Sequence, residues 1–137
     1  MSNNDSPITN NPKRNNITVL IAEDDSSIAN LLSMQLELAG YKVILAANGK
    51  IAKDSIVNNK PNFVLMDISM PELNGFEVME AVKNEGMNLE SFKIVFLSNS
   101  STPGDIEKAA SFGAQYKVKA ELSPKELINV IDQSLSI

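Results

Sequence analysis

The sequence predicts an α/β fold in which five strand-helix units build one parallel sheet with helices on both of its faces. Two observations carry this prediction. From Ile17 onward, short apolar runs alternate with longer amphipathic stretches, which is the pattern of repeated βα units. The runs are also almost free of polar residues, as is typical of strands that helices cover on both sides.

The first unit has a strand over residues 17–22 and a helix over residues 27–39. The helix is indicated by apolar residues that recur on one face: Ile28, Leu31, Leu32, Leu36 and Ala39. Gly40 is expected to end this helix. The second unit has a strand over residues 41–46 and a helix over residues 50–58, which stops before Pro61.

The third strand is expected to end at Asp67 and the fourth at Ser98, with a helix over residues 76–84 between them. Gly75 lets the backbone turn sharply out of the loop that follows Asp67. The last two helices are expected over residues 104–111 and 124–134.

The fifth strand is expected over residues 115–119. The segment Ser123-Pro124-Lys125-Glu126 is typical of a capping box with proline at the first helical position. Residues 1–16 are rich in Asn and poor in apolar side chains, which predicts a flexible N-terminal tail without chemistry. Residues 17–137 then form one domain, with no residues left for a second.

Composition excludes several classes of function. The formal charge of -5 and the pI near 4.7 disfavour a nucleic-acid-binding domain. No apolar run approaches the ~20 residues that cross a bilayer, so cytoplasmic residence is expected. The chain contains no Cys and no His, which excludes disulfides, thiolate zinc sites and histidine bases within this polypeptide.

Acidic residues follow two of the buried strands. Glu23 and Asp24 come directly after the first strand, and Asp67 closes the third. Because the carboxyl ends of parallel strands meet at one edge of the sheet, these carboxylates are expected to gather in one crevice. Taken alone, Asp24 or Asp25 suits helix capping as well as it suits metal binding, and Asp25 is expected to be the cap. Oxygen ligands without His or Cys favour Mg²⁺ or a similar ion.

An ionised Asp67 beside Mg²⁺ can act as a nucleophile toward phosphorus. Lys119, at the end of the fifth strand, can supply a cation, and Ser98 can donate a hydrogen bond to a phosphoryl oxygen. Taken singly, Lys119 fits an ordinary surface lysine better, and Ser98 fits a loop hydroxyl better.

Five motifs in order carry a resemblance that covers the chain from about Ile17 to the C-terminus. They are Val19-Leu20-Ile21-Ala22-Glu23-Asp24-Asp25, Val64-Leu65-Met66-Asp67 with Met70-Pro71 and Gly75, Phe96-Leu97-Ser98, Gly113-Ala114, and Tyr116-Lys117-Val118-Lys119. The chain resembles the response-regulator receiver domains of two-component signalling. The resemblance implies a flavodoxin-like, doubly wound parallel sheet with strand order 2-1-3-4-5.

The resemblance also implies roles for particular residues. Asp67 matches the phosphoacceptor, Asp24 the direct ligand of Mg²⁺ (or Mn²⁺) and Glu23 its acidic partner. Ser69 would offer its backbone carbonyl to the metal.

Three further residues match the parts that hold the phosphoryl group and respond to it. Ser98 and Lys119 match the hydroxyl and the ammonium that hold this group. Tyr116 matches the aromatic switch residue, which changes rotamer when that hydroxyl moves.

The sequence departs from the family pattern at three places. Ala120 follows Lys119 where the family usually has Pro. Gln115 alone separates Gly113-Ala114 from Tyr116, one residue fewer than is common, so Lys117 is a conceivable substitute for Lys119. Asn99 is bulkier than the usual residue, and we hypothesise that it slows access to Asp67.

The expected function is a phosphorylation-dependent switch that accepts a phosphoryl group on Asp67 from a phosphohistidine of a partner, catalysing only its own phosphorylation and dephosphorylation. The partners would be a histidine kinase or histidine phosphotransfer protein and a downstream protein, with no nucleic acid and no membrane. The switch would be a monomer or a phosphorylation-dependent dimer, either as a single-domain regulator or as part of a longer one.

Two alternatives stay open from the sequence. One is a receiver-like scaffold that works by unphosphorylated protein contacts, which Ala120 and Asn99 slightly favour and which the full acidic set and Ser98 count against. The other is a Mg²⁺-dependent phosphatase that resembles haloacid dehalogenases. Those enzymes carry an Asp-x-Asp pair after the first strand, whereas here Asp24 separates Glu23 from Asp25.

Overall fold

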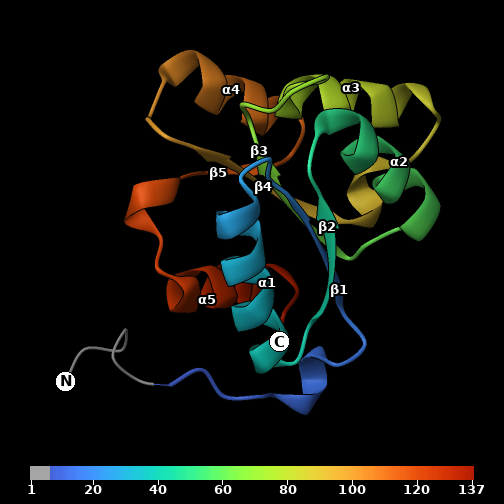
Figure 1. Ribbon diagram of the computed structural model, residues 1–137. Coiled ribbons are helices and arrows are strands. Elements are labelled where there is room, and N and C mark those ends of the chain that lie inside the picture. Colours follow the sequence, from blue (N-terminus) through green and yellow to red (C-terminus); the bar gives the residue numbers. More distant parts are fainter. Residues whose placement is uncertain (1–6) are drawn as a thin grey trace.

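The computed structural model describes residues 7–137, and its centre is a five-stranded parallel sheet (Figure 1). The strands are β1 (Thr18–Ala22), β2 (Lys42–Ala46), β3 (Phe63–Asp67), β4 (Lys93–Ser98) and β5 (Gln115–Val118). They lie in the order β2-β1-β3-β4-β5, and every neighbouring pair is parallel. The predicted fold class and strand order are therefore confirmed.

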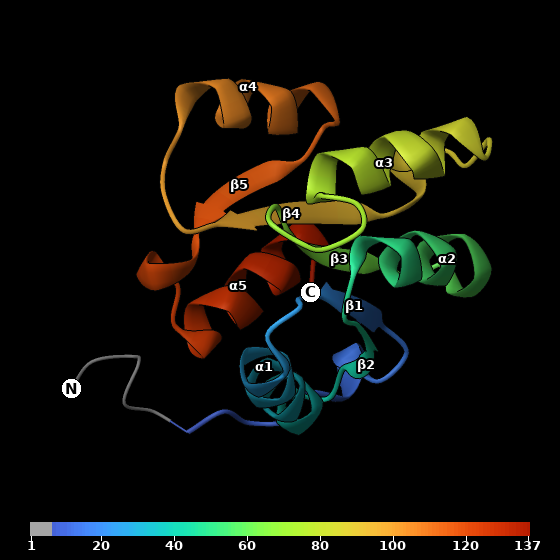
Figure 2. The ribbon, with the colours of Figure 1, turned by 45° about the horizontal axis from the view of Figure 1, so that its top comes forward.

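Helices cover both faces of the sheet (Figure 2). On one face lie α1 (Ser26–Ala39) and α5 (Pro124–Ser134). On the other lie α2 (Gly49–Asn59), α3 (Gly75–Asn84) and α4 (Pro103–Ser111). Three single 3₁₀ turns, at Pro12–Arg14, Leu89–Ser91 and Lys119–Glu121, complete the regular structure of the described residues.

Alternate residues of the three central strands supply two separate hydrophobic cores. One core, under α2, α3 and α4, takes Leu20, Val64, Met66, Ile94 and Phe96. The other, under α1 and α5, takes Val19, Ile21, Phe63, Leu65 and Val95. Because both side-chain rows of each strand are buried, the strands read as continuous apolar runs. The polar groups at the strand ends are thereby left at the rim of the sheet.

The residues that were predicted to begin or end helices do cap them in the structure. The Asp25 carboxylate accepts hydrogen bonds from the backbone N–H of Ser27 (2.9 Å) and of Ile28 (3.2 Å) at the start of α1. Gly40 ends α1 in the left-handed region, with φ of 113°. Ser123 and Glu126 form the predicted capping box of α5.

One predicted boundary is wrong. The fifth strand was expected to include Lys119, but its pairing with β4 ends at Ser98 and Val118. Lys119 begins the 3₁₀ turn instead, and its carbonyl accepts a hydrogen bond from the N–H of Leu122 at 3.2 Å. Lys119 therefore lies just beyond the end of β5, at the rim of the sheet, and is not paired with β4.

The N-terminal segment makes specific contacts from residue 7 onward. Residues 1–6 of the predicted tail lie outside the described residues, and the boundary at residue 17 stays a prediction. The Arg14 guanidinium donates to both carboxylate oxygens of Asp132 in α5, at 2.6 and 3.0 Å, and to the carbonyl of Ala39 at 3.0 Å. Ile8 packs against the core under α1 and α5. Through these contacts, residues 7–16 pack against the domain. The sequence did not predict them.

Candidate functional site

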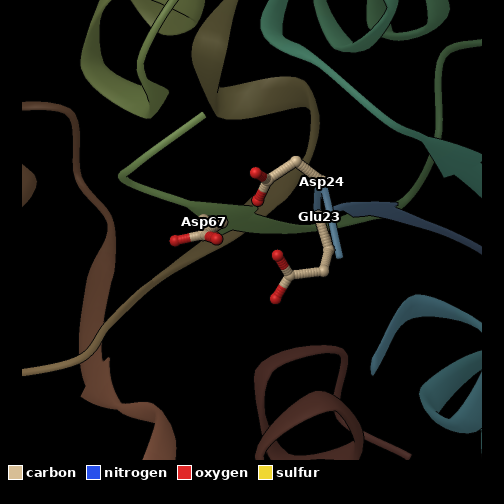
Figure 3. Close-up of side chains that lie close together, drawn as sticks. All are labelled: Glu23, Asp24 and Asp67. Atoms are coloured by element: carbon tan, nitrogen blue, oxygen red, sulfur yellow. The ribbon is translucent and has the colours of Figure 1, made fainter. Parts of the chain in front are cut away.

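Three carboxylates converge at the carboxyl end of the sheet (Figure 3). Glu23 and Asp24 follow β1, and Asp67 is the last residue of β3. Each offers one oxygen, and these three oxygens all lie within 4.8 Å of one another. Glu23 and Asp67 are each only 5% exposed, whereas Asp24 is open to solvent.

The sheet register explains why these side chains meet. β1 and β3 are direct neighbours, and Ala22 pairs with Met66. Glu23 follows Ala22 and Asp67 follows Met66, so the two residues lie at the same level at the ends of neighbouring strands. The N–H of Glu23 is still held by the carbonyl of Ala46 at 3.0 Å, which fixes the start of the loop.

Lys119 joins the two buried carboxylates. Its Nζ lies 2.8 Å from Oε1 of Glu23 and 2.8 Å from Oδ2 of Asp67. Burial by itself lowers the pKa of Lys119, but the hydrogen bonds to Asp67 and Glu23, together with their charges, outweigh it and raise the pKa above its ordinary value. The ammonium is therefore charged at neutral pH and compensates part of the acidic cluster.

The cluster suits a hard divalent cation. Three carboxylates and one ammonium leave an excess of negative charge, and every ligand atom available is oxygen. The second oxygens of the buried pair have only long contacts: Oε2 of Glu23 with the N–H of Asp25 and Oδ1 of Asp67 with the N–H of Ser69, both at 3.3 Å. These lone pairs are available to a cation, so the residues present fit Mg²⁺ or Mn²⁺.

The two serines that the family resemblance singled out lie at the same rim of the sheet. Ser69 is exposed and lies two residues after Asp67. Ser98 ends β4, next to β3, is half-buried, and its Oγ accepts a hydrogen bond from the N–H of Ser100 at 3.4 Å. Neither hydroxyl is hydrogen-bonded to the acidic cluster in residues 7–137.

Tyr116 and Lys117 lie on β5, away from the carboxylates. The Tyr116 hydroxyl donates to the carbonyl of Ser100 at 2.5 Å. Lys117 pairs with Leu97 in the sheet, and it forms no ion pair within the described part of the chain. The ammonium that reaches the acidic cluster is thus that of Lys119. This holds although the spacer between Gly113-Ala114 and Tyr116 is one residue shorter than is common in the family.

An apolar pocket of about 440 Å³ adjoins the cluster. Its polar lining residues are Glu23, Asn99 and Lys119. Its apolar walls come from α1, from the end of β4, and from the segment before α5 with the first turn of α5: Ile28, Leu31, Leu32, Leu97, Ala120, Leu122, Pro124 and Leu127. Of these residues, Ile28, Leu31 and Leu32 were predicted only as the apolar face of a helix, because periodicity does not tell a covered face from an open one.

Comparisons with known proteins agree with this geometry. A family model described as the response regulator receiver domain matches residues 19–132. The chain belongs to the receiver-domain family of response regulators. Among curated relatives, it is 30% identical over 118 residues to the response regulator SaeR of Staphylococcus aureus, an alignment that covers 86% of this chain and 50% of the relative. The chain thus spans about half the length of the curated relatives it matches.

Solved receiver structures share the fold. The CheY-like receiver domain of Methanospirillum hungatei superposes with a TM-score of 0.78 at 26% identity, covering 88% of this chain and 94% of that one. The chemotaxis protein CheY4 of Vibrio cholerae gives 0.74 at 26% identity, covering 85% and 97%. Family membership and the position of Asp67 at the third strand leave the dehalogenase-like phosphatase without support. No helix in residues 7–137 has the length and apolar character needed to span a bilayer.

One contact of the site was not foreseen from the sequence. The N–H of Gly49, the first residue of α2, donates to the carbonyl of Pro71 in the loop between β3 and α3 at 3.2 Å. The Asn48-Gly49 pair indicates a turn, but nothing in its pattern shows what the turn touches. The second strand-helix unit therefore contributes to the site although it carries no chemical motif.

Proposed function

We propose that this receiver domain accepts a phosphoryl group on Asp67 from a phosphohistidine of a partner protein, in a reaction that needs Mg²⁺ or Mn²⁺. The observation that carries this proposal is the buried Asp67 carboxylate, 2.8 Å from the Lys119 ammonium and grouped with Glu23 and Asp24. The domain would act as a switch and catalyse only its own phosphorylation and dephosphorylation.

The chemistry follows from the groups present. A carboxylate oxygen of Asp67 attacks phosphorus, the phosphorus–nitrogen bond of the donor breaks, and its electron pair stays with the imidazole. Lys119 offsets negative charge on the transferred oxygens, and Ser98 can donate a hydrogen bond to one of them. Glu23, Asp24, Asp67 and the Ser69 carbonyl would hold the cation. When bound, the cation neutralises charge on the phosphoryl group.

Intact-mass measurement after incubation with acetyl phosphate and Mg²⁺ tests the proposal. Wild-type protein is expected to gain one phosphoryl group, and Asp67→Asn or excess EDTA should abolish the gain. If acetyl phosphate and a phosphohistidine protein both fail, and calorimetry finds no Mg²⁺ binding, the scaffold alternative replaces this proposal.

The donor protein is proposed to dock on α1. Leu31, Met34 and Leu38 are 53–63% exposed on the outer face of this helix, and Ile28 and Leu31 also line the pocket beside Glu23. Apolar side chains that form a contiguous exposed patch are typical of a protein-binding surface. Leu31→Gln with Met34→Gln should slow transfer from a phosphohistidine protein and leave phosphorylation by acetyl phosphate unchanged. The exposed Leu45→Gln on β2 is the control.

Phosphorylation is proposed to switch the surface of α4 and β5. Ser98 would move toward the phosphoryl group, and Tyr116 would turn after its bond to the Ser100 carbonyl breaks, which shifts the population toward a second arrangement. A downstream protein would bind this surface. Asn99 would slow access to Asp67, so Asn99→Ala should shorten the lifetime of the phosphorylated state.

We infer a cytoplasmic protein with protein partners rather than nucleic acid, in keeping with the net charge of -5. It would be a monomer or become a dimer on phosphorylation. Size-exclusion chromatography before and after treatment with acetyl phosphate distinguishes these two states.

A further inference from the structure

The loop between β3 and α3, residues 68–74, is closed at its base. The N–H of Gly75 donates to the carbonyl of Ile68 at 2.9 Å, so the loop returns to its starting point. A Cβ at position 75 would lie 2.7 Å from the carbonyl oxygen of Asp67 and 2.9 Å from Cγ of Met66. Only glycine permits this approach. The base of the loop is therefore fixed directly beside Asp67.

The far side of the loop rests on the first residue of α2. The carbonyl of Pro71 accepts two backbone hydrogen bonds, from Gly49 at 3.2 Å and from Leu73 at 2.9 Å. A Cβ at position 49 would overlap the carbonyl oxygen of Leu73 and lie 2.6 Å from its Cβ and 2.7 Å from its carbonyl carbon. The contact joins backbone to backbone, so rotation of a side chain cannot relieve an added methyl group. Between these contacts, Glu72 takes a left-handed conformation with φ of 73°.

The start of α2 is itself firmly held. The Asn48 side chain caps the helix by accepting from the N–H of Ile51 at 2.9 Å. Ala52 and Ile56 are fully buried in the core under α2, α3 and α4. Gly49 is therefore a fixed support, against which the loop adopts one position.

We propose that Gly49 is a positioning residue for the metal site. By supporting the loop through Pro71 and Leu73, it sets the location of Ser69, whose carbonyl would bind the cation and whose N–H contacts Oδ1 of Asp67 at 3.3 Å. Gly49 itself touches none of the reacting groups. This inference rests on the proposed function, because it presumes that the cluster of Glu23, Asp24 and Asp67 holds Mg²⁺.

The test is calorimetric Mg²⁺ titration of wild type, Gly49→Ala and Gly104→Ala. Gly104 lies near the start of α4, and a Cβ there would meet nothing within 4 Å, so it is a matched glycine control. Groups that orient metal ligands typically contribute about tenfold or more to affinity. Gly49→Ala is expected to weaken Mg²⁺ binding about tenfold, while Gly104→Ala binds as wild type does. Equal affinities for all three proteins would overturn the inference.

A second measurement needs no substitution and decides the matter even if Gly49→Ala does not fold. Amide hydrogen exchange of wild type, followed by NMR, compares Gly49 with Ile51, whose N–H donates to the side chain of the helix cap Asn48. If the loop is held through the bond from Gly49 to Pro71, Mg²⁺ slows exchange at Gly49, while Ile51, whose N–H is not bonded to the loop, is unchanged. Unchanged exchange at Gly49, in wild type saturated with Mg²⁺, contradicts the proposed coupling.

Failure of the inference is distinct from failure of the proposed function. If wild type itself binds no Mg²⁺, the metal site is refuted, and the role of Gly49 falls with it. If wild type binds Mg²⁺ and Gly49→Ala binds it equally well, the metal site stands and only the positioning role is lost.

Discussion

Lys119 places a positive charge between two carboxylates that water hardly reaches. Glu23 and Asp67 are each 5% exposed, and the Lys119 ammonium lies 2.8 Å from an oxygen of each. Removing one partner of a buried ion pair leaves an uncompensated charge, which destabilises far more than loss of a surface pair. A divalent cation and this ammonium therefore serve partly the same electrostatic purpose.

Replacing Lys119 by Met should show this overlap. Lys119→Met is expected to lower the free energy of unfolding by about 3 kcal/mol without Mg²⁺, because Glu23 and Asp67 lose their shared cation. Millimolar Mg²⁺ should restore part of the loss by binding the folded state, and phosphoryl uptake should fall.

Urea unfolding with and without Mg²⁺ measures the effect, and Lys42→Met, at an exposed position of β2, is the control. A loss of stability that Mg²⁺ does not change would contradict this account of the cluster.

Residue patterns predicted the acidic cluster better than the contact of Lys119. Glu23, Asp24 and Asp67 follow apolar runs directly, so parallel strands had to bring them to one rim. Which lysine reaches the cluster depends on the register of β5, a short strand that is only half-buried. The sequence alone therefore allowed either Lys117 or Lys119. Sequence periodicity does not fix which residue of an edge strand reaches beyond the sheet.

At the scale of elements, adjacent acidic residues are divided between a helix and the site. Asp25 accepts from the N–H groups of Ser27 and Ile28 and begins α1, whereas Asp24 contributes an oxygen to the carboxylate cluster. The two residues are therefore expected to respond differently to substitution.

Asp25→Ala should lower the free energy of unfolding by about 1 kcal/mol, the usual contribution of an N-cap, with little change in Mg²⁺ affinity. Asp24→Asn should do the reverse, weakening Mg²⁺ binding while unfolding changes little. Chemical denaturation and Mg²⁺ titration of both variants check this. If Asp25→Ala loses more Mg²⁺ affinity than Asp24→Asn does, Asp24 is not the metal ligand of this pair.

Helices and central strands were predictable because their signals are local. Gly40, Ser123 and Glu126 end or begin helices by chemistry that operates within a few residues. The contact of Gly49 with Pro71 and Leu73 was not predictable, because it joins the start of α2 to the loop between β3 and α3, and only the folded sheet brings these two together.

At the scale of the whole molecule, one network ties three distant parts of the chain. Asp132 of α5 accepts from Arg14 of the N-terminal segment and from the hydroxyl of Tyr41, which precedes β2. Arg14 also lies over the Tyr41 ring, 5.6 Å from its centre. Composition predicted a free tail here, and an ion pair 118 residues apart in the chain leaves no local signal.

This network predicts loss of stability in alkali. Burial, and then the hydrogen bond to Asp132 and its charge, raise the pKa of Tyr41 above its ordinary value near 10. The folded state then holds the phenol proton more tightly than the unfolded state does. Its contribution to stability is therefore complete below about pH 10 and is lost as the pH rises further.

Tyr41→Phe removes this titration. It should be less stable than wild type at pH 8 by about 1 kcal/mol, for the lost hydrogen bond, but should lose less stability between pH 10 and pH 11. Urea unfolding at the three pH values compares the slopes. Parallel slopes for the two proteins would show that Tyr41 does not titrate differently in the folded state.

The central claim is that Asp67 carries the phosphoryl group, and chemical trapping tests it most directly. Borohydride reduces an aspartyl phosphate to homoserine, which peptide mass spectrometry locates in the chain. After treatment with acetyl phosphate and Mg²⁺, the account predicts homoserine at position 67 and at no other acidic residue. Homoserine at Asp24 or Asp25 instead, or none in protein that has gained phosphoryl mass, would contradict it.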